Sequence, residues 1–123
     1  MASPELAIVW QKGIDADAAM TRTEVTQWLL ICRSAFMSWE DSFLQHLVGA
    51  LDQAAFDSYS AGVRSSMGQV GLRAAWKLFG GQFGKGLRDF VDAQLAATPV
   101  AQTVDLYAEW QKAVQAIKPK PSG

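Results

Sequence analysis

The spacing of apolar residues along the chain is typical of helices. They return every three to four positions through most of the sequence, which places them on one side of a helix. In the longest run, Thr21 and Glu24 have the spacing of a capping box, and the pattern continues to about Val48, before Gly49. No segment alternates apolar and polar residues as a half-buried strand does. We therefore predict an all-α protein with one long central helix over about 22–48.

Shorter helical runs lie on both sides of the long one, separated by glycines or capping residues. The predicted segments are Ser3-Pro4 to Gly13, Asp52 to Met67, Leu72 to Phe79, Phe83 to Leu95, and Thr98-Pro99 to Ile117. The last helix is expected to carry Tyr107, Trp110, Val114 and Ile117 on its inside. The expected fold is a single small bundle of five or six helices over 1–117, with 118–123 as an exposed tail.

Composition and charge exclude several classes of protein. Half of the 123 residues are apolar, which is enough for one domain with a packed core. Eleven basic residues stand against twelve acidic ones without a basic cluster, so a nucleic-acid partner is not expected. We see no run long enough to span a bilayer and no signal peptide, so we expect a cytoplasmic protein, with peripheral membrane association left open.

The single cysteine limits the chemistry further. Cys32 excludes an internal disulfide framework and a zinc site built from several cysteines. It lies in an apolar run, so we expect a buried, unreactive thiol.

Two charged residues fall on the apolar side of the long helix. On a wheel of about 100° per residue, Arg33 and Glu40 lie in the centre of a wide apolar arc. They are two turns apart, which is too far for a close pair within one helix, so each should pair with another helix. Arg64 and Arg73 are the candidates for Glu40, because an unpaired buried carboxylate is costly. This predicts a central polar cluster, either a structural Glu–Arg pair or, less favoured, the centre of a site.

The sequence contains none of the common catalytic or metal-binding motifs. His46 is the only histidine; it lies at the edge of the apolar arc near Trp28 and Trp39, and a hydrogen-bonded histidine at the core edge is the favoured interpretation. No Glu-x-x-His pair, Gly-x-Ser-x-Gly motif or phosphate loop is present, so we expect no metal and no cofactor. The glycine-rich stretch 80–86 fits neither nucleotide-binding motif and favours a hinge or a close helix crossing.

An ordered set of residues carries a resemblance over most of the chain, up to about Leu95. These residues are Pro4-Glu5-Leu6-Ala7, Trp10, Gly13, Trp39-Glu40-Asp41, Phe43, Gln45, Gly49, Leu51-Asp52, Phe56, Tyr59, Gly71-Leu72-Arg73, Trp76, Phe79 and Phe90-Val91-Asp92. The order resembles a family of uncharacterised bacterial all-helical proteins. Its members often carry one or two transmembrane helices before this region, so the resemblance implies a soluble version, or the soluble part, of such a protein. It supports the helical fold and singles out Glu40, Gln45, Arg73 and Trp76, but implies no reaction.

Three functions stay open from the sequence. The favoured one is a non-enzymatic interaction or regulatory module that binds a protein partner or a second copy of itself. The second is a binder of a small molecule or lipid, in a pocket lined by Trp28, Trp39, Phe43 and Trp76. The third and least favoured is an enzyme with Glu40 and His46 as acid and base, since the two side chains point about 120° apart. The candidate cluster comprises Glu40, Arg33, Arg64, Arg73, His46, Gln45, Trp39 and Trp76.

Overall fold

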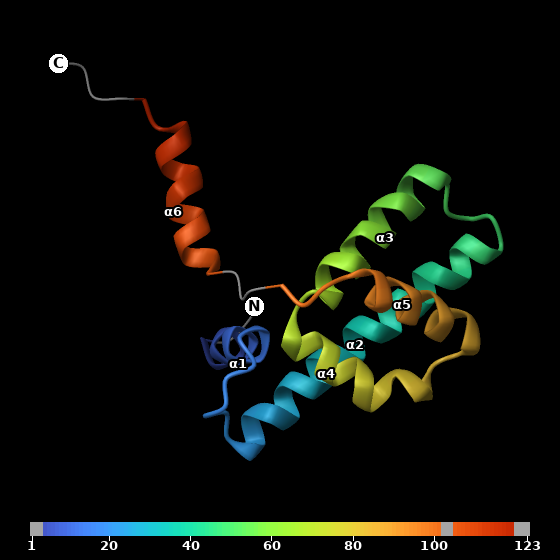
Figure 1. Ribbon diagram of the computed structural model, residues 1–123, viewed down its shortest axis with the longest axis horizontal. Coiled ribbons are helices and arrows are strands. Elements are labelled where there is room, and N and C mark those ends of the chain that lie inside the picture. Colours follow the sequence, from blue (N-terminus) through green and yellow to red (C-terminus); the bar gives the residue numbers. More distant parts are fainter. Residues whose placement is uncertain (1–3, 102–104, 120–123) are drawn as a thin grey trace.

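The computed structural model describes residues 4–101 and 105–119, and these contain helices and no strand (Figure 1). The elements are α1 (Pro4–Ile14), α2 (Arg22–Leu47), α3 (Gln53–Met67), α4 (Val70–Phe79), the 3-10 turn η1 (Gly80–Gln82), α5 (Lys85–Ala97) and α6 (Leu106–Ile117). The all-α prediction and its long central helix are therefore confirmed. The predicted cap at Ser3 and most of the predicted tail lie outside the described residues, while Lys118 and Pro119 are exposed.

The ends of α2 follow from its own sequence. Thr21 caps the first turn: its side chain accepts a hydrogen bond from the backbone N–H of Glu24, and the Glu24 side chain accepts one from the backbone N–H of Thr21. The helix ends at Leu47, followed by Gly49 with a φ of 76°. Glycine adopts this left-handed conformation at little cost, so the chain turns there towards α3.

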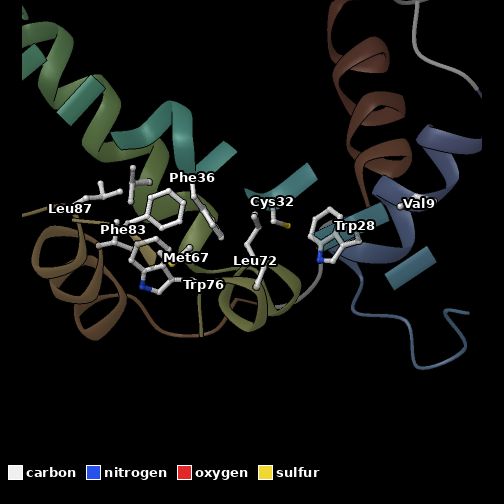
Figure 2. Close-up of a cluster of buried hydrophobic side chains, with 12 residues drawn as sticks. Val9, Trp28, Cys32, Phe36, Met67, Leu72, Trp76, Phe83 and Leu87 are labelled. Carbon is white, nitrogen blue, oxygen red and sulfur yellow. The ribbon is translucent and has the colours of Figure 1, made fainter. Parts of the chain in front are cut away.

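The core lies between α2 and the helices packed around it. α2 packs against α1, α4 and α5, and α3 packs against α4 and α5. Figure 2 shows the buried cluster: Trp28 lies near Val9 at one end, and Trp76, Phe83 and Leu87 lie at the other. These five helices form a unit that we call the body, residues 4–97.

The closest helix crossing in the body depends on two glycines. A Cβ atom at Gly71 would lie 1.8 Å from the carbonyl oxygen of Gly13, and one at Gly13 would lie 2.1 Å from ring atoms of Trp28. The indole N–H of Trp28 donates to the carbonyl of Gly71 at 3.3 Å. Gly13 therefore lets α1 and α4 meet over the Trp28 ring, and α1 continues one residue beyond it to Ile14.

The last helix differs from its prediction in two ways. α6 begins at Leu106 with Asp105 as its cap, several residues after the predicted start at Thr98-Pro99. None of its residues is buried, so the prediction that its apolar residues lie inside was wrong. Figure 1 shows α6 extending away from the body.

The late start of α6 has a physical cause in the segment before it. Thr98 is extended, with φ −114° and ψ 116°, as expected for a residue that precedes proline. Its carbonyl accepts a hydrogen bond from Arg73, and the N–H of Ala101 donates to the carbonyl of Gly68 at 2.9 Å. These contacts hold the chain after α5 along the body in a conformation that is not helical.

Candidate functional site

Glu40 occupies a different environment from the one predicted. One of its carboxylate oxygens accepts a hydrogen bond from the backbone N–H of Gly84 at 2.9 Å. Gly84 is the N-cap residue of α5 and has no side chain to satisfy the free N–H groups there. A carboxylate also interacts favourably with the positive end of the helix dipole. No ion pair joins Glu40 to an arginine in the described part of the chain, so the predicted Glu40–Arg pair was wrong.

The Arg73 side chain connects the C-terminal ends of two helices, α3 and α5. Its guanidinium donates to the carbonyls of Met67 at the end of α3, of Leu95 in the last turn of α5, and of Thr98 just beyond it. The last carbonyls of a helix lack partners within the helix, and a guanidinium with several donors can satisfy more than one of them. Arg73 thus fixes the end of α5, while Glu40 fixes its beginning.

The two remaining arginines and Gln45 lie outside the core. Arg33, Arg64 and Gln45 are all exposed. Arg33 is exposed because the body covers only the part of the α2 arc that carries Trp28 and Phe36. The apolar arc of α2 is wider than the part of it that the other helices bury. The centre of the arc, where Arg33 lies, is therefore at the edge of the buried surface.

The aromatic members of the predicted cluster, Trp39 and Trp76, both pack against Phe36, with ring centroids 5.0 and 5.1 Å from its ring. The Trp39 carbonyl accepts a hydrogen bond from the Tyr59 hydroxyl at 2.8 Å, and burial raises the pKa of Tyr59 to about 12. The Trp76 indole N–H donates to Asp92 at 2.9 Å. Trp28 and Trp76 line different grooves, so the predicted aromatic pocket is not formed by these residues.

His46 stacks on an aromatic ring instead of approaching Trp28 and Trp39. Its ring centroid lies 3.6 Å from that of Phe56 in α3, with an angle of 9° between the planes. Glu40, in contrast, contacts the start of α5. The two groups that would act as acid and base are therefore held by different helices and different partners.

Cys32 matches its prediction. Its side chain is buried in the core cluster, and burial raises the pKa of the thiol to about 12. A thiol with such a pKa is protonated near neutral pH and is a poor nucleophile. The described residues also include no group of three or more histidine, cysteine or acidic side chains placed to hold a metal ion.

A groove that the sequence did not reveal lies beside Trp76. It has a volume of about 240 Å³, and its walls include Lys77, Gly80, Arg88 and Asp92. The Nε atom of Arg88 is shielded from solvent and has no hydrogen-bond partner in the described part of the chain. Asp92 accepts a hydrogen bond from Trp76 through one of its oxygens, so the groove carries two cationic side chains and one carboxylate. The only sequence signal was the glycine-rich stretch 80–86, which indicated a close approach of helices but not the arginine.

A larger groove runs between α1 and α2. It has a volume of about 420 Å³ and is lined by Leu6, Ala7, Trp10, Gln11 and Ile31. Among the described residues that line it, Gln11 is the polar one, so an apolar group fits this groove better than a charged one.

Comparisons with protein-family models, with curated protein sequences and with solved structures found no match. The resemblance to the bacterial helical family therefore stays a prediction. Among the helices of the described residues, none combines the length and apolar character needed to cross a membrane.

Proposed function

We propose that the chain is a non-enzymatic interaction module in which α6 binds a partner protein. The exposed apolar side of α6 carries this proposal: Tyr107, Trp110 and Ile117 are 69%, 66% and 83% exposed. Monomeric proteins rarely present such a contiguous apolar surface unless it is a binding site.

The spacing of these residues suggests how the partner binds. Tyr107, Trp110, Val114 and Ile117 follow one another at intervals of three, four and three residues. That is the anchor spacing of an amphipathic helix that lies in an apolar groove of another protein. Tyrosine and tryptophan are also the residue types that dominate binding energy in interfaces. The opposite side carries the Glu109–Lys112 ion pair at 3.3 Å, which can stay in solvent.

The polar residues of the body support a role without catalysis. Glu40 caps α5, Arg73 donates hydrogen bonds to carbonyls at the ends of two helices, and His46 stacks on Phe56. Each of them has a structural partner, and Glu40 and Arg73 contact opposite ends of α5. A catalytic pair needs groups that converge on one reacting atom.

Site-specific photo-crosslinking in host cells tests this role. A benzoylphenylalanine in place of Trp110 should give one discrete adduct with another protein. The same substitution at Lys112, on the polar side of α6, is the matched control and should give none. After the partner is identified, Trp110→Ala should weaken its binding at least tenfold, about 1.4 kcal/mol or more. Equal labelling from both positions, or labelling from neither, would contradict the proposal.

The groove beside Trp76 favours a second function, the binding of a small anion. Arg88 has an unsatisfied, shielded Nε, and Lys77 lines the same groove. A phosphate or carboxylate in the groove would interact with both positively charged side chains. In a thermal-shift titration with phosphate and citrate, an anion at ~100 times its Kd should stabilise the protein by about 2.7 kcal/mol. Arg88→Gln should abolish this gain, whereas Arg64→Gln, at an exposed arginine of α3, should leave it unchanged. An equal gain in the Arg88 variant would reject the site.

A further inference from the structure

The α2 helix has a second apolar side that the body leaves open. Leu30, Met37 and Leu44 are 58%, 55% and 51% exposed. They are seven residues apart, so they line up along one side of the helix, and Val48 continues the line. We call these four residues the outer stripe. The opposite side of α2 carries Trp28, Cys32 and Phe36, which are buried in the core.

Two unpaired charges flank the middle of the outer stripe. Arg33 lies four residues before Met37 and Asp41 lies four residues after it. Both are exposed, and neither forms an ion pair with any described residue. On the helix wheel they lie at equal angles on the two sides of Met37, at about 40° each.

Along the stripe, the charged residue and the leucine next to Met37 therefore follow in the same order in both directions, except that the charge changes sign. Towards the N-terminus come Arg33 and then Leu30; towards the C-terminus come Asp41 and then Leu44. A surface of this kind is complementary to itself when a copy is turned end for end. A two-fold dimer requires this property, because the same patch must match itself.

We propose that α2 pairs with α2 of a second copy of the chain, antiparallel, with Met37 at the two-fold axis. In this pair Leu30 lies level with Leu44 of the second copy, and Arg33 lies level with Asp41 of the second copy. The two-fold symmetry forms each contact twice. A parallel pair would instead bring Arg33 level with Arg33 and Asp41 level with Asp41, and like charges oppose that arrangement.

The size of the stripe sets the strength of this dimer. The segment from Leu30 to Val48 spans about 27 Å of helix at ~1.5 Å per residue. One helix pair of that length lies near the lower limit of specific interfaces, so we expect a dimer that dissociates on dilution. The surface is separate from α6, so the dimer does not depend on the role proposed for α6.

Sedimentation equilibrium over a range of concentrations is the first test. The chain should pass from 13.4 kDa to twice that mass as its concentration rises. Met37→Glu, which places two like charges at the axis, should leave only monomer. Removing residues 102–123 should leave the dimer intact. A wild-type chain that stays monomeric at high concentration, or a dimer that requires α6, would overturn the proposal.

A charge exchange tests the orientation of the pair. R33E places Glu level with Asp41 and D41R places Arg level with Arg33, so each should weaken the dimer at least tenfold. The double variant R33E/D41R restores opposite charges and should restore the dimer. D57R, at an exposed site on α3, is the matched control and should have no effect. Circular dichroism checks that every variant stays folded; a double variant no tighter than the single ones would rule out the antiparallel pair.

Disulfide trapping tests the register of the same pair. Met37→Cys should form a covalent dimer under mild oxidation, because the two residues meet at the axis. A mixture of Leu30→Cys and Leu44→Cys chains should give the mixed dimer faster than either gives its own. Gln45→Cys, exposed on α2 but outside the stripe, is the control. Cys32 is 1% exposed and does not compete. Preferential Leu30–Leu30 dimers would mean a parallel pair and would overturn the proposal.

Discussion

Helices α5 and α6 have similar lengths and similar apolar patterns, but only α5 is packed. α5 has 13 residues and buries Leu87 and Val91; α6 has 12 residues and buries none. The Glu40 carboxylate accepts a hydrogen bond from the backbone N–H of the residue that caps the start of α5. The Arg73 guanidinium donates a hydrogen bond to a carbonyl in the last turn of α5. In the described part of the chain, no hydrogen bond joins α6 to the body. The difference between the two helices comes from contacts with other elements and not from their own patterns.

An apolar side on a helix is therefore not by itself evidence that the helix packs against its own chain. Amphipathic spacing predicts that something covers the side, but the covering surface can belong to the same chain or to another molecule. The outer stripe of α2 is a second example within one helix. In the packed region, substitutions should therefore change the free energy of unfolding. In α6 they should change binding and leave the free energy of unfolding almost unchanged.

The largest expected effect comes from truncating one apolar residue in each helix. Leu87→Ala removes a side chain that is 2% exposed, and should lower the free energy of unfolding by about 2–5 kcal/mol through the cavity it leaves. Trp110→Ala removes a larger but exposed side chain and should change it by less than about 0.5 kcal/mol. Urea denaturation followed by circular dichroism measures both. Similar losses would mean that α6 is packed against the body in solution.

A smaller loss is expected at the closest contact of the body. Gly13→Ala adds a methyl group where the Trp28 ring already lies, and overpacking of this kind costs about 1–3 kcal/mol. Gly62, in α3, is the matched control because no atom lies within 4 Å of an added Cβ atom. Gly62→Ala should raise the free energy of unfolding by about 0.4–1 kcal/mol, since alanine favours a helix more than glycine. If both substitutions stabilise the protein, the α1–α4 crossing has room for an added methyl group at Gly13 in solution.

Helix ends set by local chemistry were predictable from the sequence. The capping box of Thr21 and Glu24 and the cap at Asp52 each lie within a few residues of the N–H groups they satisfy. Gly49 likewise marks the end of α2 through its own φ. Such features depend on a short segment and on the preferences of its residues, so the sequence contains the needed information.

Features that depend on contacts between distant segments were not predictable. The start of α6 was misplaced because Arg73 and Gly68 hold residues 98–101 out of a helix. The partner of Glu40 was misassigned because it is the backbone N–H of Gly84, 44 residues away, and every residue except proline carries such an N–H, so the residue type gives no signal. A helix wheel also gives the width of an apolar arc but not the part of it that neighbouring helices cover.

The role of Glu40 at the start of α5 gives a prediction of intermediate size. Glu40→Gln keeps an acceptor for the Gly84 N–H and loses only the interaction of the charge with the helix dipole, worth about 0.3–1 kcal/mol. Glu40→Ala also loses the acceptor and should cost about 0.5–2 kcal/mol. Asp57→Asn, at an exposed site on α3, is the control for loss of charge. A loss of about 3–5 kcal/mol in Glu40→Gln would indicate a buried partner of positive charge instead.

The smallest expected effect compares an ion pair of the body with one of α6. Lys12 of α1 donates to Glu24 of α2 at 2.8 Å, and this hydrogen bond lowers the pKa of Glu24 and raises that of Lys12. A carboxyl whose pKa falls on folding stabilises the protein above its unfolded pKa of 4.5, and this contribution is lost as the pH falls through the folded value. Lys12 contributes below its unfolded pKa of 10.5 and loses its contribution as the pH rises through its folded value.

Glu24→Gln keeps the capping contacts with Thr21 and removes the titration, so the unfolding temperature should fall less steeply between about pH 6 and pH 3 than in the wild type. Glu109→Gln breaks the exposed Glu109–Lys112 pair within α6 and should leave that slope unchanged. Differential scanning calorimetry at a series of pH values measures both slopes. Because the Lys12–Glu24 pair joins two helices and the α6 pair lies within one, an equal flattening in the two variants would show that α6 unfolds together with the body.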